Sequence, residues 1–334
     1  MMYYGLAISV CLAALFLVLA CASMAGKPLG KVLAARLRSQ APATVANVFF
    51  AIRTLPLFLS VALTLGLVLP AYLKFEPRAT GEPMSVKLLL LSTAGALALL
   101  LMSVRALRVL RSTARAERTW RAAGSAANQE QVVNVAGSQV PVYYVETAPA
   151  LLAVTGFVRP RVFVASEVAR MLSPEEFYAA LNHEMAHASF FDNLKKLLLR
   201  ITRLPRWLGG SATEDALWLS ISEVAADEAA LARGASALDL ASALVKMGSL
   251  KTTAQAGDQI AASHLLPDLG GSALEMRVTR LRKLIEGDSA GPKVRRSQTW
   301  RLLVMIVIPS VLAYIAAIST LLPAVHDALE FLVR

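Results

Sequence analysis

Cysteine, aromatic residues and charge are all scarce in this sequence of 334 residues. Its two cysteines, Cys11 and Cys21, lie in one apolar run, which argues against disulfide stapling and against a paired-cysteine metal site. Aromatic residues make up 7%, with no RNP-like or zinc-finger pattern, which argues against nucleic-acid readout. Charged residues make up 17% and hydrophobic residues 56%, and the mean hydropathy is +0.55. These values are too apolar for an ordinary water-soluble domain and predict a membrane protein.

Four apolar stretches are long enough to cross a hydrocarbon core, which takes about 20 residues as a helix. They lie at about residues 4–25, 54–73, 86–104 and 302–325. The first has no Lys or Arg before its long apolar core, so we interpret it as a retained anchor, with a cleaved signal peptide as the alternative. The sequence therefore predicts a mainly α membrane protein with four transmembrane helices.

Basic residues are unevenly distributed between the predicted loops. The formal net charge is +11, yet no acidic residue precedes Glu76. The loops after the first and third predicted spans are rich in Lys and Arg, whereas the loop between the second and third is near neutral. Because short basic loops stay in the cytoplasm, we expect an inner (plasma) membrane protein with both termini outside and residues 105–301 in the cytoplasm. The arginines then orient the chain and attract the lipid bilayer, and no nucleic-acid partner is expected.

The predicted cytoplasmic segment changes from strands to helices along its length. Short runs rich in Val, Tyr and Phe predict strands at 131–135, 139–145, 151–155 and 161–165. Helices are predicted at 174–188, 214–233, 235–247 and 273–285. Ser173 and Glu176 form a capping box that opens the first of these helices. Residues 193–208 are basic and amphipathic, and their apolar face either lies on the membrane surface or belongs to the domain core.

The first predicted helix carries an H-E-x-x-H motif, His183-Glu184-Met185-Ala186-His187. Residues four apart share a face of a helix, so both imidazoles can reach one Zn²⁺. Glu184, one step around the helix, can address a water bound to that metal. The motif alone is suggestive of hydrolytic zinc chemistry, because three fixed residues of these types also arise by chance.

A catalytic zinc also needs a third protein ligand and an open position for water. Glu223, in the segment SEVAADEAA, is the candidate ligand, and Asp227 lies about one turn further along. Asp227 can accept a hydrogen bond from the other ring nitrogen of a ligand histidine and so fix its tautomer. The alternative is that these acids form a solvated helix face; the H-E-x-x-H helix favours the metal site.

Together these residues resemble the membrane gluzincin metallopeptidases. HEMAH followed 36 positions after His187 by EVAAD shares their ligand order, and TGFVRPRVFVASEVARMLSPEEFYAALNHEMAHASFFDNL is similar to the BlaR/MecR-type membrane peptidases. HtpX and the CAAX prenyl proteases are similar relatives. The resemblance implies a cytoplasmic α+β zincin-like domain with a small sheet. It also implies His183, His187 and Glu223 as zinc ligands and Glu184 as the general base.

The resemblance and the spacing imply hydrolysis of peptide bonds in a protein or peptide substrate. A tetrahedral oxyanion needs a second electrophile besides the metal. His264 is the candidate, although a lone histidine is more often structural. We expect the substrate to add as a strand along the edge formed by Leu151, Ala153 and Thr155, which relatives partly imply.

One departure from the BlaR/MecR-type pattern concerns the input signal. Antibiotic-sensing members carry an extracellular penicillin-binding sensor after the last span, whereas this chain ends at Arg334, about ten residues past the fourth predicted span. Reception of β-lactams is therefore not carried over, and the activating signal is expected from a regulatory partner, the loops or the membrane. Regulated signalling proteolysis is the expected function. An HtpX-like quality-control protease and a non-catalytic membrane scaffold are the alternatives.

Overall fold

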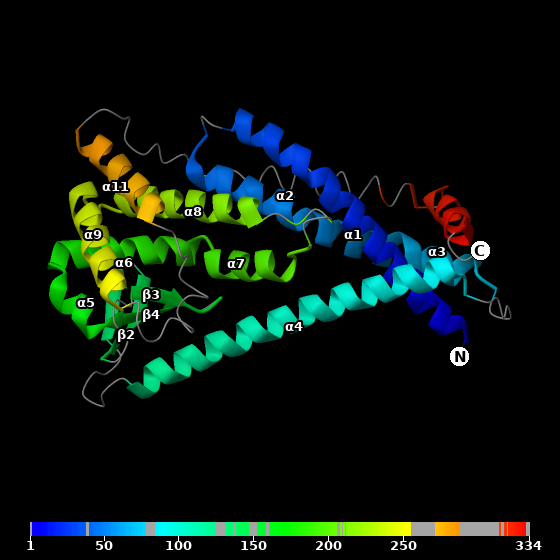
Figure 1. Cartoon of the computed structure of the whole chain (residues 1–334), viewed down its shortest axis with the longest axis horizontal. Coiled ribbons are helices and arrows are strands. Elements are labelled where there is room, and N and C mark those ends of the chain that lie inside the picture. The colour runs from blue at the N-terminus through cyan, green and yellow to red at the C-terminus, as the bar shows by residue number, and fades with distance from the viewer. Residues whose placement is uncertain are drawn as a thin grey trace.

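The computed structural model is mostly helical, with one small sheet (Figure 1). It describes residues 2–37, 40–77, 84–123, 131–135, 138–146, 152–157, 160–205, 208, 210, 212–254, 271–286, 314, 317–318 and 320–331. The sheet and the shorter helices gather at one end, and the long helices of the first third of the chain extend toward them from the other end.

Three helical segments among the described residues are long and apolar enough to cross a membrane. They are Tyr3–Gly30 in α1 (Met2–Arg36), Pro42–Phe75, and Val86–Ala122 in α4 (Val86–Ala123). The middle segment consists of α2 (Pro42–Leu63), a π-helical turn (Thr64–Val68) and α3 (Leu69–Phe75).

All three helices run past the predicted span limits of 4–25, 54–73 and 86–104. Lys and Arg end an apolar stretch but are good helix formers, so the change in hydropathy does not end the helix. The predicted boundary between residues 104 and 105 consequently falls inside α4, which continues as far as the sheet (Figure 1).

Helices α1 and α4 cross at very close range. A Cβ atom added to Gly95 of α4 would lie 2.3 Å from the carbonyl oxygen of Leu12 in α1, so only glycine fits this crossing. Val10 and Ala13 of α1 and Leu88 of α4 are fully buried nearby. Small residues allow such an approach between membrane helices, where packing rather than exclusion of water drives association.

Residues 302–325, the predicted fourth span, lie largely outside the described residues. Within this stretch, the Tyr314 hydroxyl donates a hydrogen bond to the Gly66 carbonyl, in the π-helical turn, at 2.5 Å. Helical residues 320–331 follow, and Leu329 packs with Leu6 of α1 and Leu88 of α4. The described N- and C-terminal parts therefore lie at the same end of the long helices (Figure 1).

The sheet contains the four predicted strands in the order β1-β2-β4-β3. They are β1 (Gln131–Val135), β2 (Ser138–Val145), β3 (Leu152–Thr155) and β4 (Arg161–Ala165). Strands β2 and β4 are parallel, whereas β1 pairs antiparallel with β2 and β3 pairs antiparallel with β4. Strand β3 is thus an edge strand.

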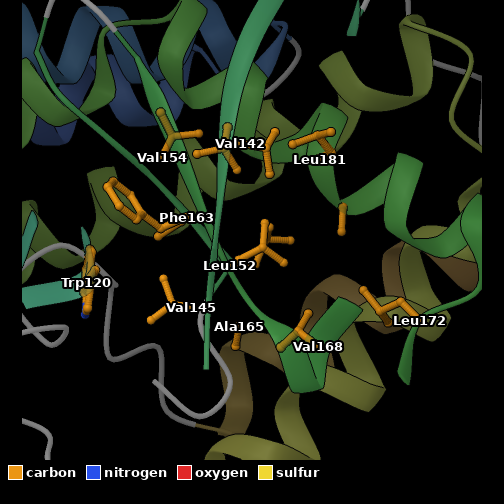
Figure 2. Packing of buried hydrophobic residues seen from close by; sticks show 14 of the residues in the cluster. Trp120, Val142, Val145, Leu152, Val154, Phe163, Ala165, Val168, Leu172 and Leu181 are labelled. Carbon is orange, nitrogen blue, oxygen red and sulfur yellow. The ribbon is translucent and has the colours of Figure 1, made fainter. Parts of the chain in front are cut away.

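The main core lies between this sheet and the helices beside it. Val142, Phe163 and Val164 of the sheet are fully buried there, together with Leu181 of α6 (Pro174–Ser189), as Figure 2 shows in part. Trp120, near the end of α4, lies against Phe163 with ring centroids 5.3 Å apart. The last turns of α4 therefore anchor the sheet to the long helices.

Six more helices lie in this part of the molecule among the described residues. They are α5 (Ser166–Met171), α6, α7 (Asp192–Ile201), α8 (Ala212–Ala232), α9 (Ala237–Ala254) and α11 (Gly271–Ile285). All except α5 were expected from the sequence, and the capping box of Ser173 and Glu176 at the start of α6 is confirmed. The Glu176 carboxylate also accepts hydrogen bonds from Ser242 and Lys246 of α9, which ties α6 to α9.

The first part of the amphipathic stretch at 193–208 lies in α7, which ends at Ile201. Leu199 of α7 is 5% exposed and packs with Phe49 of α2 and Trp218 of α8. Leu197 and Ile201, which belong to the predicted apolar face, lie nearly opposite Leu199 on the helix and are half-buried. The membrane surface and the domain core therefore both stay predictions for that face.

Candidate metal centre

The H-E-x-x-H motif lies in the second half of α6 and presents both histidines inward. His183 and His187 are 5% and 7% exposed. Their rings meet edge to face, and their Nε2 atoms are 3.2 Å apart. The spacing of four residues therefore places two imidazole nitrogens at one buried point, as predicted.

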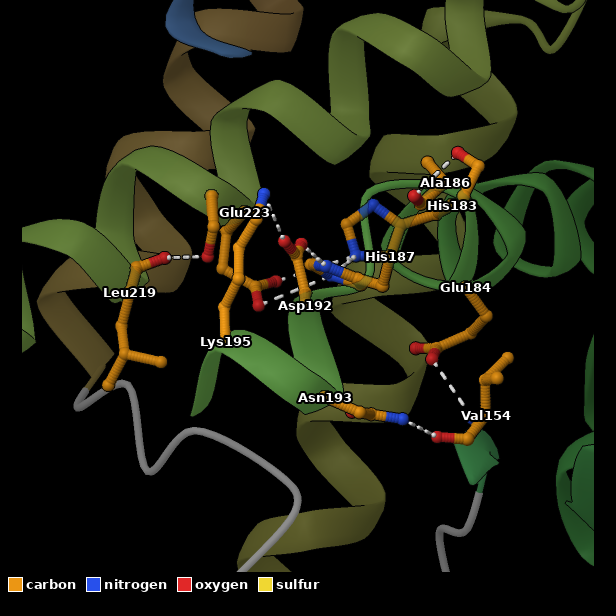
Figure 3. Close-up of polar contacts among 12 residues, drawn as sticks. Val154, His183, Glu184, Ala186, His187, Asp192, Asn193, Lys195, Leu219 and Glu223 are labelled. Carbon is orange, nitrogen blue, oxygen red and sulfur yellow. Dashed lines mark hydrogen bonds and ion pairs between the residues drawn. The ribbon is translucent and has the colours of Figure 1, made fainter. Parts of the chain in front are cut away.

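Glu223, from the middle of α8, completes a group of three possible ligands (Figure 3). Its carboxylate oxygens lie 3.4 Å from Nε2 of His183 and 3.4 Å from Nε2 of His187. In tetrahedral zinc sites the metal–ligand distances are about 2.0–2.2 Å, so neighbouring ligand atoms are about 3.3–3.5 Å apart. The two Nε2 atoms are 3.2 Å apart, Glu223 Oε2 is 3.4 Å from Nε2 of His183, and Glu223 Oε1 is 3.4 Å from Nε2 of His187. One ligand atom from each residue lies within 4.8 Å of the other two, so the donor set fits a zinc ion with small adjustments of the side chains.

Each histidine is held from behind by an aspartate. Nδ1 of His183 lies 2.9 Å from Asp227 Oδ1, and Nδ1 of His187 lies 2.7 Å from Asp192 Oδ2. A carboxylate that accepts the Nδ1 hydrogen fixes the tautomer and directs the Nε2 lone pair at the centre. The predicted position of Asp227 behind a histidine is therefore found, whereas Asp192 was missed by the sequence analysis.

A tight turn brings Asp192 back to His187. Helix α6 ends at Ser189 and α7 begins at Asp192, and Phe191 between them has a φ of 56°. A left-handed conformation is costly for a residue with a bulky side chain and persists where the surroundings demand it. This turn leaves Asp192 2% exposed beside the ring.

Arg277 of α11 was also missed by the sequence analysis. Its Nε and Nη2 atoms donate to the two carboxylate oxygens of Asp227 at 2.9 and 2.6 Å, and its Nη1 donates to Glu223 at 2.9 Å. The planar fork of an arginine suits such bidentate pairing. Arg277 is 8% exposed, so one buried cation fixes the relative position of two acids one helical turn apart on α8.

These contacts shift the acid–base properties of the buried groups. Burial raises the pKa of Glu223, but His187, His183 and Arg277 outweigh burial and hold this pKa well below its usual value. Burial likewise raises the pKa of Asp227, and Arg277 and His183 reverse the shift. Burial lowers the pKa of His187, whereas Glu223 and Asp192 raise it, with a net result of about 9. The acids of the centre are therefore ionised and paired with the histidines and Arg277.

Glu184 points away from the ligands, toward the edge strand β3. The backbone N–H of Val154 donates to its Oε2 at 3.3 Å, and Asn193 of α7 donates to the Val154 carbonyl at 2.9 Å (Figure 3). Both backbone groups of Val154 thus face away from β4. Along an antiparallel edge strand, the backbone groups of alternate residues point away from the sheet. In β3 the outward-pointing groups are those of Val154, whereas those of Ala153 and Thr155 point toward β4.

The other predicted site residues have mixed outcomes. Ala153 and Thr155 lie in β3 and are 3% and 0% exposed, whereas Leu151 and His264 lie outside the described residues. Asn193, which also donates to the Gly156 carbonyl at 3.3 Å, holds the end of β3 beside α6 and was not singled out from the sequence.

Comparison of the chain with protein-family models, with curated proteins and with solved structures finds no match.

Proposed function

We propose that this chain is an integral membrane zinc endopeptidase that hydrolyses peptide bonds of a protein substrate at the cytoplasmic membrane face. The observation that carries the proposal is the buried group of His183, His187 and Glu223, in which one ligand atom from each residue lies within 4.8 Å of the other two. Glu184, the residue next to a ligand in the H-E-x-x-H motif, stands between that group and an edge strand.

The residues around the centre have distinct tasks in this reaction. Zinc, held by His183, His187 and Glu223, would polarise the scissile carbonyl and acidify the attacking water. Glu184 would take the proton from that water and deliver it to the leaving amine. The outward backbone groups of Val154 would align an extended substrate, after Glu184 and Asn193 release them.

Arg277 holds the acids in place rather than binding the oxyanion. Each of its guanidinium nitrogens already donates to Asp227 or Glu223. His264 therefore remains the candidate for the second electrophile.

The proposed setting has four transmembrane helices and a zincin-like cytoplasmic domain. Three long apolar helices support it directly, and the hydrogen bond from Tyr314 to Gly66 supports a fourth span beside the second. The basic loops favour both termini outside, as the sequence analysis argued. Regulated signalling proteolysis is the proposed role, with quality control of membrane proteins as the alternative within the same enzyme class.

The test compares cells that express the native chain with cells that express Glu184→Gln, by sequencing the new protein N-termini in each. We expect cleavage products that depend on Glu184, with one zinc per chain in both purified proteins. Glu175→Gln, which changes an exposed acid on the same helix, is the matched control. Identical N-termini in native and Glu184→Gln cells, at full zinc occupancy, would contradict the proposal. A narrow product set would favour signalling, and a broad one would favour quality control.

Metal analysis separates the enzyme from a non-catalytic membrane scaffold. Replacement of His183, His187 and Glu223 together by alanine should abolish zinc binding. Absence of zinc from the native protein, or zinc retained by the triple variant, would support the scaffold.

A further inference from the structure

Helix α2 packs against α7 and α8, two of the helices that support the metal centre. Ala46 and Phe49 of α2 form one buried cluster with Leu199 of α7 and Trp218 of α8. Helix α7 begins with Asp192, which holds His187, and α8 carries Glu223. One of the long apolar helices therefore packs directly against the helices that carry Asp192 and Glu223.

A chain of polar contacts leads from α2 to a ligand histidine. The Lys195 ammonium donates to Oδ1 of Asn47 in α2 at 2.8 Å and lies 3.4 Å from Oδ1 of Asp192. Oδ2 of the same aspartate accepts from His187 Nδ1 at 2.7 Å. The two oxygens of Asp192 are thus divided between a lysine fixed by α2 and a histidine that faces the centre (Figure 3).

The Lys195 side chain is itself confined at this position. It is 15% exposed, and its ammonium lies 5.9 Å from the centre of the Phe50 ring, again in α2. Burial lowers the pKa of Lys195, and Asp192 counters that shift. A lysine held between an amide, a ring and a carboxylate has little freedom to reorient, so the position of α2 constrains the orientation of Asp192.

A second connection lies about two turns further along α2. The Arg53 guanidinium lies 3.3 Å from Asp215 in the first turn of α8 and donates to the Thr202 carbonyl, at the end of α7, at 3.4 Å. The side chains of Arg53 and Asp215 are 10% and 18% exposed. Helix α2 is therefore fastened to the end of α7 and to the start of α8, the helix that carries Glu223.

We propose that Asn47 and Lys195 are positioning residues that link the second apolar helix to the metal ligand His187. Lys195 holds one oxygen of Asp192 so that the other stays aligned with Nδ1, and Asn47 fixes the lysine. Movement of α2 would release Asp192 and loosen the ligand. This link rests on the proposed zinc site and gives the membrane-spanning part of the chain a direct means of tuning it.

The experiment measures zinc affinity of the full chain in lipid nanodiscs, by competition with a chromophoric chelator. Replacement of a residue that holds a metal-binding histidine costs about 10–100-fold in affinity. Lys195 and Asn47 act through Asp192 and so lie further from the metal than Asp192 does. Lys195→Met and Asn47→Ala should therefore each weaken zinc binding by a smaller factor, roughly 3–10-fold. Lys195→Arg and Asn47→Asp, which keep a donor and an acceptor in place, should restore most of the affinity.

Two controls distinguish a specific effect of this chain of contacts, which we call the relay (Asn47, Lys195, Asp192 and His187), from general destabilisation of the protein. Lys196→Met removes the same charge from the next residue, whose ammonium lowers the pKa of His187 by its charge, and should change zinc affinity less than twofold. The double variant Asn47→Ala/Lys195→Met should bind zinc no more weakly than Lys195→Met alone, because both changes break one chain of contacts. With Co²⁺ as the probe, the visible absorption bands should shift in the two relay variants and not in Lys196→Met.

The outcomes are separable from those for the proposed function. Two results would overturn the relay alone, provided that the native chain binds zinc normally. One is native zinc affinity in both Lys195→Met and Asn47→Ala, and the other is an equal loss of affinity in Lys195→Met and Lys196→Met. Loss of affinity that Lys195→Arg and Asn47→Asp do not restore would also overturn it. A native chain that binds no zinc would overturn the relay and the proposed function together.

Discussion

Oδ2 of Asp192 accepts the Nδ1 hydrogen of His187 across 2.7 Å, at a position that is 2% exposed. Asp192→Asn removes the charge and keeps the size of the side chain. We expect zinc affinity to fall about 10–100-fold, because the imidazole loses basicity and orientation. Equilibrium competition with a chelator measures the change. Asp239→Asn, in the first turn of α9, is the control, and equal losses in the two variants would contradict this role.

Much of the ligand set follows from sequence spacing, for a physical reason. His183 and His187 share a face because they are four residues apart on one helix, and Glu223 and Asp227 share a face of α8 for the same reason. Local periodicity thus fixes each pair by itself. The sequence analysis predicted that α6 and α8 meet because a zinc site needs a third ligand. The structure brings the side chains of His183, His187, Glu223 and Asp227 together.

The residues that were missed depend on tertiary contacts. Asp192 reaches His187 through a turn in which Phe191 has a positive φ, and position 191 is not the glycine or asparagine that usually marks such a conformation. Arg277 lies 94 positions from His183, on a helix whose sequence resembles any basic amphipathic helix. The helices run beyond the predicted spans because hydropathy reports only the apolar part of a helix, whereas hydrogen bonding carries α4 on to Ala123.

The Arg277 guanidinium pairs with both Glu223 and Asp227. Arg277→Met leaves two buried carboxylates without this partner and should lower the free energy of unfolding by about 3–5 kcal/mol in the metal-free protein. Bound zinc supplies positive charge, so the variant should gain more thermal stability from zinc than the native protein does. Melting temperatures with and without zinc measure both effects.

Arg282→Met, on the exposed side of the same helix, is the control for Arg277. Arg277→Lys keeps the charge but loses the bidentate fork, and an intermediate loss is expected. Equal melting temperatures for the Arg277 and Arg282 variants would contradict the assigned role.

The hydrogen bonds to the Glu176 carboxylate predict that part of the protein's stability is lost in acid. Hydrogen bonds from Lys246, Ser242 and the Ser173 backbone lower the pKa of Glu176 from 4.5 to about 2. Because the pKa is lower in the folded state, its stabilising contribution is present above pH 4.5 and is lost as the pH falls toward 2. Glu176→Gln should therefore melt at a lower temperature at pH 7, and the gap to the native protein should close in acid.

Glu175→Gln is the matched control for Glu176, since Glu175 is exposed and accepts a hydrogen bond from the Ser173 hydroxyl. Thermal melts between pH 2 and 7 distinguish the two variants. A gap between native and Glu176→Gln protein that stays constant over this range would show that the carboxylate does not carry the effect.

The crossing of α1 and α4 tolerates no side chain at Gly95. A Cβ atom there would lie 2.3 Å from the Leu12 carbonyl oxygen and 2.9 Å from its carbon, and both are backbone atoms that cannot rotate away. Gly95→Ala should therefore force the helices apart and lower the free energy of unfolding by about 1–3 kcal/mol. Gly5→Ala in α1 meets nothing within 4 Å and, because alanine favours a helix, should leave the melting temperature unchanged or slightly higher. Melting of the full chain in nanodiscs compares the two, and a Gly95→Ala protein as stable as Gly5→Ala would show that the two helices do not meet at this distance.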